Sequence, residues 1–96
     1  MHISLDEALT LLNGWKNRET PLDVYVSRPG FLQDLKGKVR ELRGTTVEVH
    51  ADQSNLQIDL QGADFNGDGS SREYLVCEFR DGKRYSFYGL RANAGV

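Results

Sequence analysis

The sequence predicts a mainly β domain with one N-terminal helix, whose strands form a strongly bent antiparallel sheet or small barrel of five to six strands. Two observations support this class. Apolar residues recur at helical spacing only at the start of the chain, and from Asp23 onward they alternate with polar residues in short runs broken by Gly, Pro, Asn and Asp. A chain of 96 residues fits one domain, taken as 1–96.

The helix is predicted over about residues 4–18. One apolar stripe defines it, made of Leu5, Ala8, Leu9, Leu12 and Trp15. Ser4 and Glu7 have the spacing of a capping box, in which each side chain satisfies the backbone N–H of the other residue. Pro21 disfavours helical geometry at the residue before it, so the helix is expected to end between Lys16 and Glu19.

Six strands are predicted within a barrel region of about residues 23–90, and the tail 91–96 is expected to be frayed. Their bounds are about Asp23–Arg28, Leu35–Leu42, Thr46–Ala51, Leu56–Gln61, Tyr74–Arg80 and Lys83–Tyr88. Asp81-Gly82 suits a type I′ turn between the last two, because both central positions of that turn need positive φ.

This two-residue turn assigns side chains to faces in the last hairpin. One face would carry Leu75, Cys77, Phe79, Arg84, Ser86 and Tyr88, and the other would carry Val76, Glu78, Arg80, Lys83, Tyr85 and Phe87. Both faces would then hold apolar bulk. One would line the core, and the other would need the helix or a second subunit to cover it, which favours a homo-oligomer.

Charge and composition restrict the partners. Twelve Lys and Arg against 14 Asp and Glu give a net charge of −2, so any contact with nucleic acid depends on a local patch. Cys77 is the one cysteine, which excludes an internal disulfide, and the start of the chain does not resemble a secretory signal. No apolar run reaches the roughly 20 residues that span a bilayer. We therefore expect a cytoplasmic protein with no membrane partner.

A row of cations lies in one predicted strand: Lys36, Lys38 and Arg40. Alternation would point all three side chains to one face at about 6.8 Å spacing, which is close to the phosphate spacing of a nucleic acid strand. The alternative is an internally paired, solvated face. Pairing Val39 with Val49 would set the partners of these cations as Asp52, His50 and Glu48 respectively.

Aromatic residues in the β region are candidates for stacking on bases, provided that the rings are exposed beside positive charge. Tyr85 and Tyr88 are the best candidates, because Lys83, Arg84 and Arg91 lie near them in the sequence. Core packing is the alternative use of such rings.

Catalysis has little support in the sequence, because a nucleophile needs a base and an orienting group. The two histidines are His2 and His50, and Cys77 lies in a predicted central strand, where a free cysteine usually acts as a small apolar residue. No glycine-rich phosphate loop or zinc-ligand spacing occurs. No catalytic residue, cofactor or small-molecule substrate is predicted.

The stretch GADFNGDGSSREY contains half of a calcium loop, with Asp64, Asn66 and Asp68 as the possible ligands and Gly69 after them. The twelfth position, which should be Glu, is Leu75. Asn-Gly and Asp-Gly also favour turns, so a polar loop between two strands accounts for the same residues. A weak Ca²⁺ site is the alternative.

Three stretches resemble the Sm-like family of small β-barrels. VYVSRPGFLQDLKGKV is similar to the first-strand pattern of the family, DQSNLQI (Asp52–Ile58) resembles its base-binding loop, and SFYGLRA (Ser86–Ala92) resembles its late apolar-Arg-Gly motif. The resemblance implies a five-strand barrel that forms rings and often binds RNA. It implies a ligand near Asp52, Asn55, Tyr88 and Arg91, with Tyr88 in place of the motif's arginine. A simple hairpin turn is the alternative for Asp52 and Asn55.

These observations predict a non-catalytic β-barrel module for binding or assembly that self-associates, of unknown biological role. The first alternative is an Sm-like ring that binds RNA or other single-stranded nucleic acid. Its candidate residues are Lys36, Lys38, Arg40, Asp52, Asn55, Tyr88 and Arg91. The second alternative is a small metal-dependent domain or enzyme.

Overall fold

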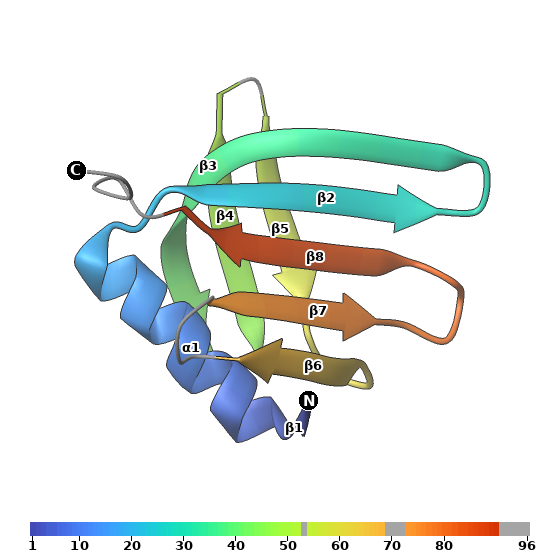
Figure 1. The fold of residues 1–96 in the computed structure, drawn as a ribbon, viewed down its shortest axis with the longest axis horizontal. Helices are drawn as coiled ribbons and strands as arrows, with labels where there is room; N and C mark the ends of the chain where they lie inside the picture. The colour runs from blue at the N-terminus through green and yellow to red at the C-terminus, as the bar shows by residue number, and fades with distance from the viewer. Residues whose placement is uncertain (53, 69–72, 91–96) are drawn as a thin grey trace.

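The computed structural model describes residues 1–52, 54–68 and 73–90 (Figure 1). Within them, eight strands form one antiparallel sheet in the order β1-β6-β7-β8-β2-β3-β4-β5, with a helix near the N-terminus. The elements are β1 (His2–Ile3), α1 (Leu5–Arg18), β2 (Leu22–Arg28), β3 (Phe31–Arg43), β4 (Thr46–Ala51), β5 (Asn55–Asp59), β6 (Asp64–Asp68), β7 (Tyr74–Glu78) and β8 (Arg84–Gly89).

The mainly β class and the N-terminal helix are confirmed, whereas the predicted strand number is wrong. The sheet has eight strands and is not closed, so it differs from the five- to six-stranded barrel and from the Sm-like barrel that the resemblance implied. The two unpredicted strands are β1, which has only two residues, and β6, whose polar outward residues had suggested a loop. β1 and β6 pair with each other, and β1 forms one end of the sheet.

Helix α1 begins and ends where the sequence predicts. The Ser4 side chain accepts from the backbone N–H of Glu7 at 3.1 Å, and the Glu7 carboxylate accepts from the backbone N–H of Ser4 at 3.0 Å. Glu19 ends the helix in the left-handed conformation, with φ of 51°. The helix packs on β3 and β6, and its buried Trp15 lies against Phe87 of β8, with ring centroids 6.4 Å apart. Among the described residues, no helix is long and apolar enough to cross a membrane.

Strand β3 forms the corner of the sheet. Its first half pairs with β2 and its second half with β4, and Gly37 is paired with both Leu22 and Ala51. A Cβ atom on Gly37 would lie 2.2 Å from the backbone oxygen of His50, so no other residue fits this close approach. The register shifts between Val39 and Glu41, and such a bulge bends the strand further. As a result β4 and β5 pass behind β8 and β7 at a steep angle (Figure 1).

The core lies between α1 and the inner face of this bent sheet. The helix contributes Ala8, Leu12 and Trp15, and the strands contribute mainly alternate apolar residues. These are Leu22, Val24, Val26, Leu35, Val39, Val47, Val49, Ile58, Phe65, Leu75, Cys77 and Phe87, with Leu60 just after β5.

The predicted face assignment of the last hairpin is wrong. The turn has three residues, because Glu78 pairs with Arg84 and the N–H of Phe79 donates to the carbonyl of Lys83 at 2.8 Å. Gly82 has positive φ, whereas Asp81 does not, so the turn is not type I′. One extra turn residue shifts the register by one and moves every residue of one strand to the opposite face.

Candidate functional site

The outer face of the sheet carries polar and aromatic side chains in regular rows, because antiparallel register aligns residues across neighbouring strands. The first row, across β7, β8, β2 and β3, is Tyr74, Tyr88, Asp23 and Lys36. The second row, across the same strands, is Val76, Ser86, Tyr25 and Asp34. Three tyrosines that are far apart in the sequence therefore share one surface.

Tyr88 contacts both of the other tyrosines. The rings of Tyr74 and Tyr88 are stacked with centroids 6.5 Å apart, and Tyr25 meets Tyr88 edge to face at 5.8 Å. Tyr88 is 42% exposed, whereas Ser86 beside it is 8% exposed. The Tyr74 hydroxyl accepts a hydrogen bond from the Met1 ammonium group at 3.2 Å. The cluster thus presents one well-exposed ring, Tyr88, held by two others.

Tyr25 and three charged side chains beside it form a connected network. The Asp23 carboxylate accepts from Lys36 Nζ at 3.2 Å and from the Tyr25 hydroxyl at 3.0 Å. Lys36 Nζ also lies 3.8 Å from an oxygen of Asp34. Asp23 and Lys36 are cross-strand neighbours, and so are Tyr25 and Asp34.

The pKa values of this network diverge. The hydrogen bond with Asp34 lowers the pKa of Asp23, opposed by partial burial and assisted by Lys36 and Tyr25. The same contact raises the pKa of Asp34, because the nearby Asp23 carboxylate disfavours a second negative charge. Hydrogen bonds to Asp23 raise the pKa values of Tyr25 and Lys36, because the neighbouring negative charge favours their protonated forms.

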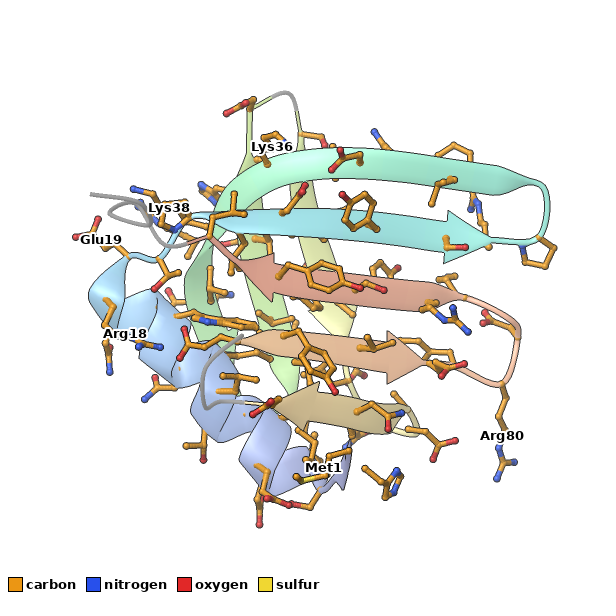
Figure 2. All side chains as sticks on the ribbon, in the orientation of Figure 1. Met1, Arg18, Glu19, Lys36, Lys38 and Arg80 are labelled. Carbon is orange, nitrogen blue, oxygen red and sulfur yellow. The ribbon has the colours of Figure 1, made fainter. Side chains whose placement is uncertain are left out.

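A pocket of about 470 Å³ opens at the corner of β3, next to this network. It brings together charged side chains from β3 and β4 with the segment before β2. Its lining includes Lys36, Lys38, Arg40, His50, Asp52 and Glu19, and its apolar part includes Pro21 and Leu90. Figure 2 shows Lys36 and Lys38 on either side of the bend in β3. The pocket exists because the Gly37 corner turns the strand between these two lysines.

The pocket contains cations without counterions. Lys36 is paired with Asp23, and His50 Nε2 lies 3.5 Å from the Glu48 carboxylate. Across the described ranges, the structure records no ion pair for Lys38 or Arg40, and both side chains are exposed. An anion such as a phosphate group would therefore meet two cations that no ion pair holds, in a pocket that the carboxylates of Glu19 and Asp52 also line.

The predicted partners of the basic row are correct at two positions. Lys38 pairs with His50, and the N–H of Asp52 donates to the carbonyl of Lys36 at 3.2 Å. The prediction of Arg40 opposite Glu48 is wrong, because the bulge brings Glu41 opposite Glu48. The bulge also breaks the simple alternation that was expected to point Lys36, Lys38 and Arg40 to one face, although all three still line one pocket.

Among the other predicted nucleic-acid residues, Asp52 lines this pocket, whereas Asn55 and Tyr88 lie on other strands. Asn55 pairs with His50, which continues the row from Lys38 to the edge strand β5. Tyr88 lies two strands from Lys36 in the first row. Arg91 lies outside the described residues. Tyr85, the other predicted stacking residue, faces inward against the core, because the three-residue turn reverses the expected faces.

The calcium half-motif does not form a loop. Asp64, Asn66 and Asp68 belong to β6, where alternate residues point to the same face at about 6.8 Å spacing instead of converging on one ion. Gly69 lies outside the described residues. Across residues 1–52, 54–68 and 73–90, no group of three or more His, Cys, Asp or Glu is arranged to hold a metal. The predicted turn-rich loop between Gly62 and Tyr74 is wrong over the span of β6.

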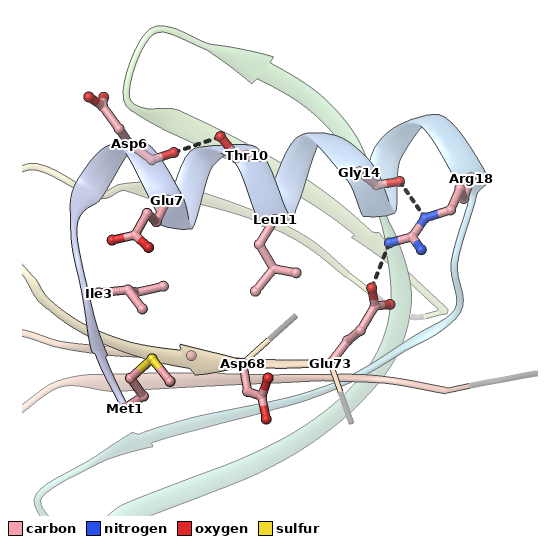
Figure 3. A pocket seen from close by; sticks show the side chains of 11 residues that line it. Met1, Ile3, Asp6, Glu7, Thr10, Leu11, Gly14, Arg18, Asp68 and Glu73 are labelled. Atoms are coloured by element: carbon pink, nitrogen blue, oxygen red, sulfur yellow. Dashed lines mark hydrogen bonds and ion pairs between the residues drawn. The ribbon is translucent and has the colours of Figure 1, made fainter. Parts of the chain in front are cut away.

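A second pocket, of about 520 Å³, lies between α1 and the β1–β6 end of the sheet (Figure 3). Met1, Ile3 and Leu11 provide its apolar surface, while Asp6, Glu7, Asp68 and Glu73 bring carboxylates to it. Glu73 is occupied on both oxygens, by Trp15 Nε1 at 3.0 Å and by Arg18 Nη2 at 2.9 Å. No pattern in the sequence indicated this contact, because Glu73 is 58 residues from Trp15.

Cys77 is fully buried in β7, and burial raises the pKa of its thiol to about 12. A thiol with that pKa holds almost no thiolate at neutral pH, and thiolate is the nucleophilic form. Its contacts are those of an apolar core residue, as the sequence predicted.

No family model matches this sequence, and no curated protein matches it.

Proposed function

We propose that this protein is a non-catalytic module that binds single-stranded nucleic acid on the outer face of its sheet. The observation that carries the proposal is the adjacency of two features. A pocket with the unpaired cations Lys38 and Arg40 lies beside a row in which Tyr88 presents an exposed ring. Proteins that bind single strands combine these elements, with cations along the backbone and aromatic rings under the bases.

The dimensions of the sheet suit such a ligand. Tyr88 and Lys36 share a row and are separated by β2, a distance of about 9.5 Å at the usual strand spacing. Lys38 follows Lys36 on β3, beyond the corner. A nucleotide with its base on Tyr88 would thus have its neighbouring phosphates within reach of the β3 pocket.

The acidic surroundings limit the strength of the electrostatic contribution. The chain has a net charge of −2, and Lys36 is already compensated by Asp23 and Asp34. Among the described cations of this pocket, Lys38 and Arg40 are left to contact phosphates, and Glu19 and Asp52 line the same pocket. Since each phosphate contact with a single strand contributes about 0.7 to the slope of log affinity against log salt, we expect a slope of roughly −1.4.

Titration of fluorescent single-stranded oligonucleotides at several salt concentrations tests the proposal. Lys38→Ala and Arg40→Ala should each weaken binding for every sequence and reduce the salt slope by about 0.7. Arg80→Ala is the matched control, because Arg80 is an exposed cation at the far end of the β7–β8 hairpin (Figure 2). Absence of binding at low salt, or equal effects of all three substitutions, would exclude this function.

Self-association through a strand edge is the second candidate, supported by the open sheet. Among the described strands, β5 lies at the end of the sheet and pairs with β4 alone; the N–H of Leu60 donates to the carbonyl of Thr45, and that of Ala51 donates to the carbonyl of Ser54. Antiparallel pairs alternate, so the backbone groups of Asn55, Gln57 and Asp59 point away from β4. An exposed edge of this kind is a template for another strand. Light scattering on a sizing column tests it, and a monomer at all concentrations would exclude it. The Sm-like resemblance stays a prediction, and neither candidate depends on it.

A further inference from the structure

Two carboxylates, Asp23 and Asp34, lie among the tyrosines of the outer face of the sheet. Each carboxylate is paired with a tyrosine on the neighbouring strand: Asp23 of β2 with Tyr88 of β8, and Asp34 of β3 with Tyr25 of β2. Side chains at such paired positions have Cβ atoms about 4.5–5.5 Å apart. Carboxylates repel phosphates, so their position beside the stacking rings calls for a different ligand group: a hydrogen-bond donor on a base.

We propose that this face selects guanine, with the base stacked on the exposed ring of Tyr88 and its Watson–Crick edge directed to Asp34. The inference rests on the proposed function and specifies its ligand. Above its raised pKa, the Asp34 carboxylate is ionised and has two acceptor oxygens and no donor. Guanine presents two adjacent donors on that edge, the N1–H and the N2 amino group, so both oxygens are satisfied at once.

Asp34 reads the base, and Asp23 is a positioning residue. The two oxygens of Asp23 already accept from Lys36 Nζ and from the Tyr25 hydroxyl, and its side chain is 17% exposed. The side chain of Asp34 is 48% exposed, and its ion-pair contact with Lys36 is longer, at 3.8 Å. Lys36 bridges the two carboxylates and so holds Asp34 next to Tyr25.

The other bases fit this arrangement less well. Adenine and cytosine each offer one amino group beside a ring acceptor, and uracil offers one N–H between two carbonyl acceptors. An acceptor opposite a carboxylate is left unpaired and repelled. A well-made pair of hydrogen bonds to a base edge discriminates by about 10-fold against bases that lack the donors.

The test uses a short uridine RNA with one central nucleotide changed to guanosine, inosine or adenosine. Inosine keeps the N1–H and lacks only the N2 amino group, so it isolates one of the two hydrogen bonds. We expect guanosine to bind roughly 10-fold more tightly than adenosine, with inosine between them. Asp34→Asn should abolish this order while the all-uridine RNA binds at least as well as before.

Asp64→Asn is the matched control, because Asp64 is an exposed carboxylate on the outer side of β6, away from the tyrosines. It removes the same charge and should leave the guanosine preference unchanged. Equal binding of all four RNAs, or a preference that survives Asp34→Asn, would overturn the guanine inference and leave the proposed function standing. Failure of every RNA to bind would overturn both.

Discussion

Gly37 of β3 lies against the backbone of His50 so closely that an added Cβ atom would be 2.2 Å from the His50 carbonyl oxygen. This contact lets β3 turn from its pairing with β2 to its pairing with β4. The blocking atoms belong to backbone and cannot rotate away. Gly37→Ala should therefore destabilise the protein by roughly 1–3 kcal/mol or more, measured by denaturant unfolding.

Gly14→Ala is the control for this substitution. Gly14 lies inside α1, and the nearest atom to its added Cβ would be Arg18 Nη2 at 3.4 Å, the end of a flexible side chain. Alanine should stabilise the helix by up to about 1 kcal/mol. If both alanines had the same effect, the corner at Gly37 would not be a tight contact.

Glu73 links the last turns of α1 to the segment before β7, because its carboxylate accepts hydrogen bonds from Trp15 Nε1 and Arg18 Nη2. Glu73→Ala leaves the N–H of the buried Trp15 without its acceptor, at a cost of roughly 1–3 kcal/mol. Glu73→Gln keeps an acceptor oxygen for Trp15 and loses only the partly exposed ion pair, so it should cost less than about 1 kcal/mol. Chemical denaturation compares the two variants. Equal losses would show that the Arg18 pair, and not the Trp15 hydrogen bond, stabilises the contact.

Tyr88 is the exposed ring of the tyrosine cluster, so its substitutions separate stacking from hydrogen bonding. Tyr88→Phe should retain nucleic-acid affinity within about twofold, whereas Tyr88→Ala should lower it roughly 10-fold through loss of one stacking surface. Fluorescence anisotropy measures both, with circular dichroism as a check on folding. An undiminished affinity for Tyr88→Ala would remove the stacking role.

Alkaline pH should weaken the network around Asp23. The pKa values of Tyr25 and Lys36 are raised in the folded protein by Asp23, with Asp34 adding to both shifts. The folded state therefore holds these protons after the unfolded state has released them, and stability falls as pH rises above about 10. The melting temperature of Tyr25→Phe should fall less steeply over this range than that of the unmodified protein. Parallel curves would contradict the assignment of the raised pKa to Tyr25.

Cys77 should resist thiol reagents in the native protein, because it is fully buried and its thiol pKa is raised to about 12. Labelling with a thiol-reactive dye should follow global unfolding, so the stabilising Gly14→Ala should slow it and Gly37→Ala should accelerate it. Rapid labelling at neutral pH without denaturant would show that β7 opens locally.

Features that depend on neighbouring residues could be predicted from the sequence, whereas the register between strands could not. The capping box of Ser4 and Glu7 uses atoms within one turn, so the start of α1 followed from local spacing alone. The last hairpin did not, because a three-residue turn in place of the expected two moved Tyr85 inward. A side-chain period of two makes every such shift a change of face.

The candidate site also combines residues that the sequence grouped together with residues that only strand pairing brought to it. Alternation along one strand identified Lys36, Lys38 and Arg40 as neighbours, and they do line one pocket. Tyr25 and Asp34 joined them only through pairing between β2 and β3, which no local pattern reveals.

By itself, then, the sequence determined the helix, the mainly β class and most strand positions, since these depend on periodicity and turn residues close together in the chain. The tertiary structure alone decided the eight-strand order, the corner at Gly37 and the pairing of tyrosines with aspartates. Those features depend on which strands meet and in which register, and both are set by burying one face of the whole sheet against α1.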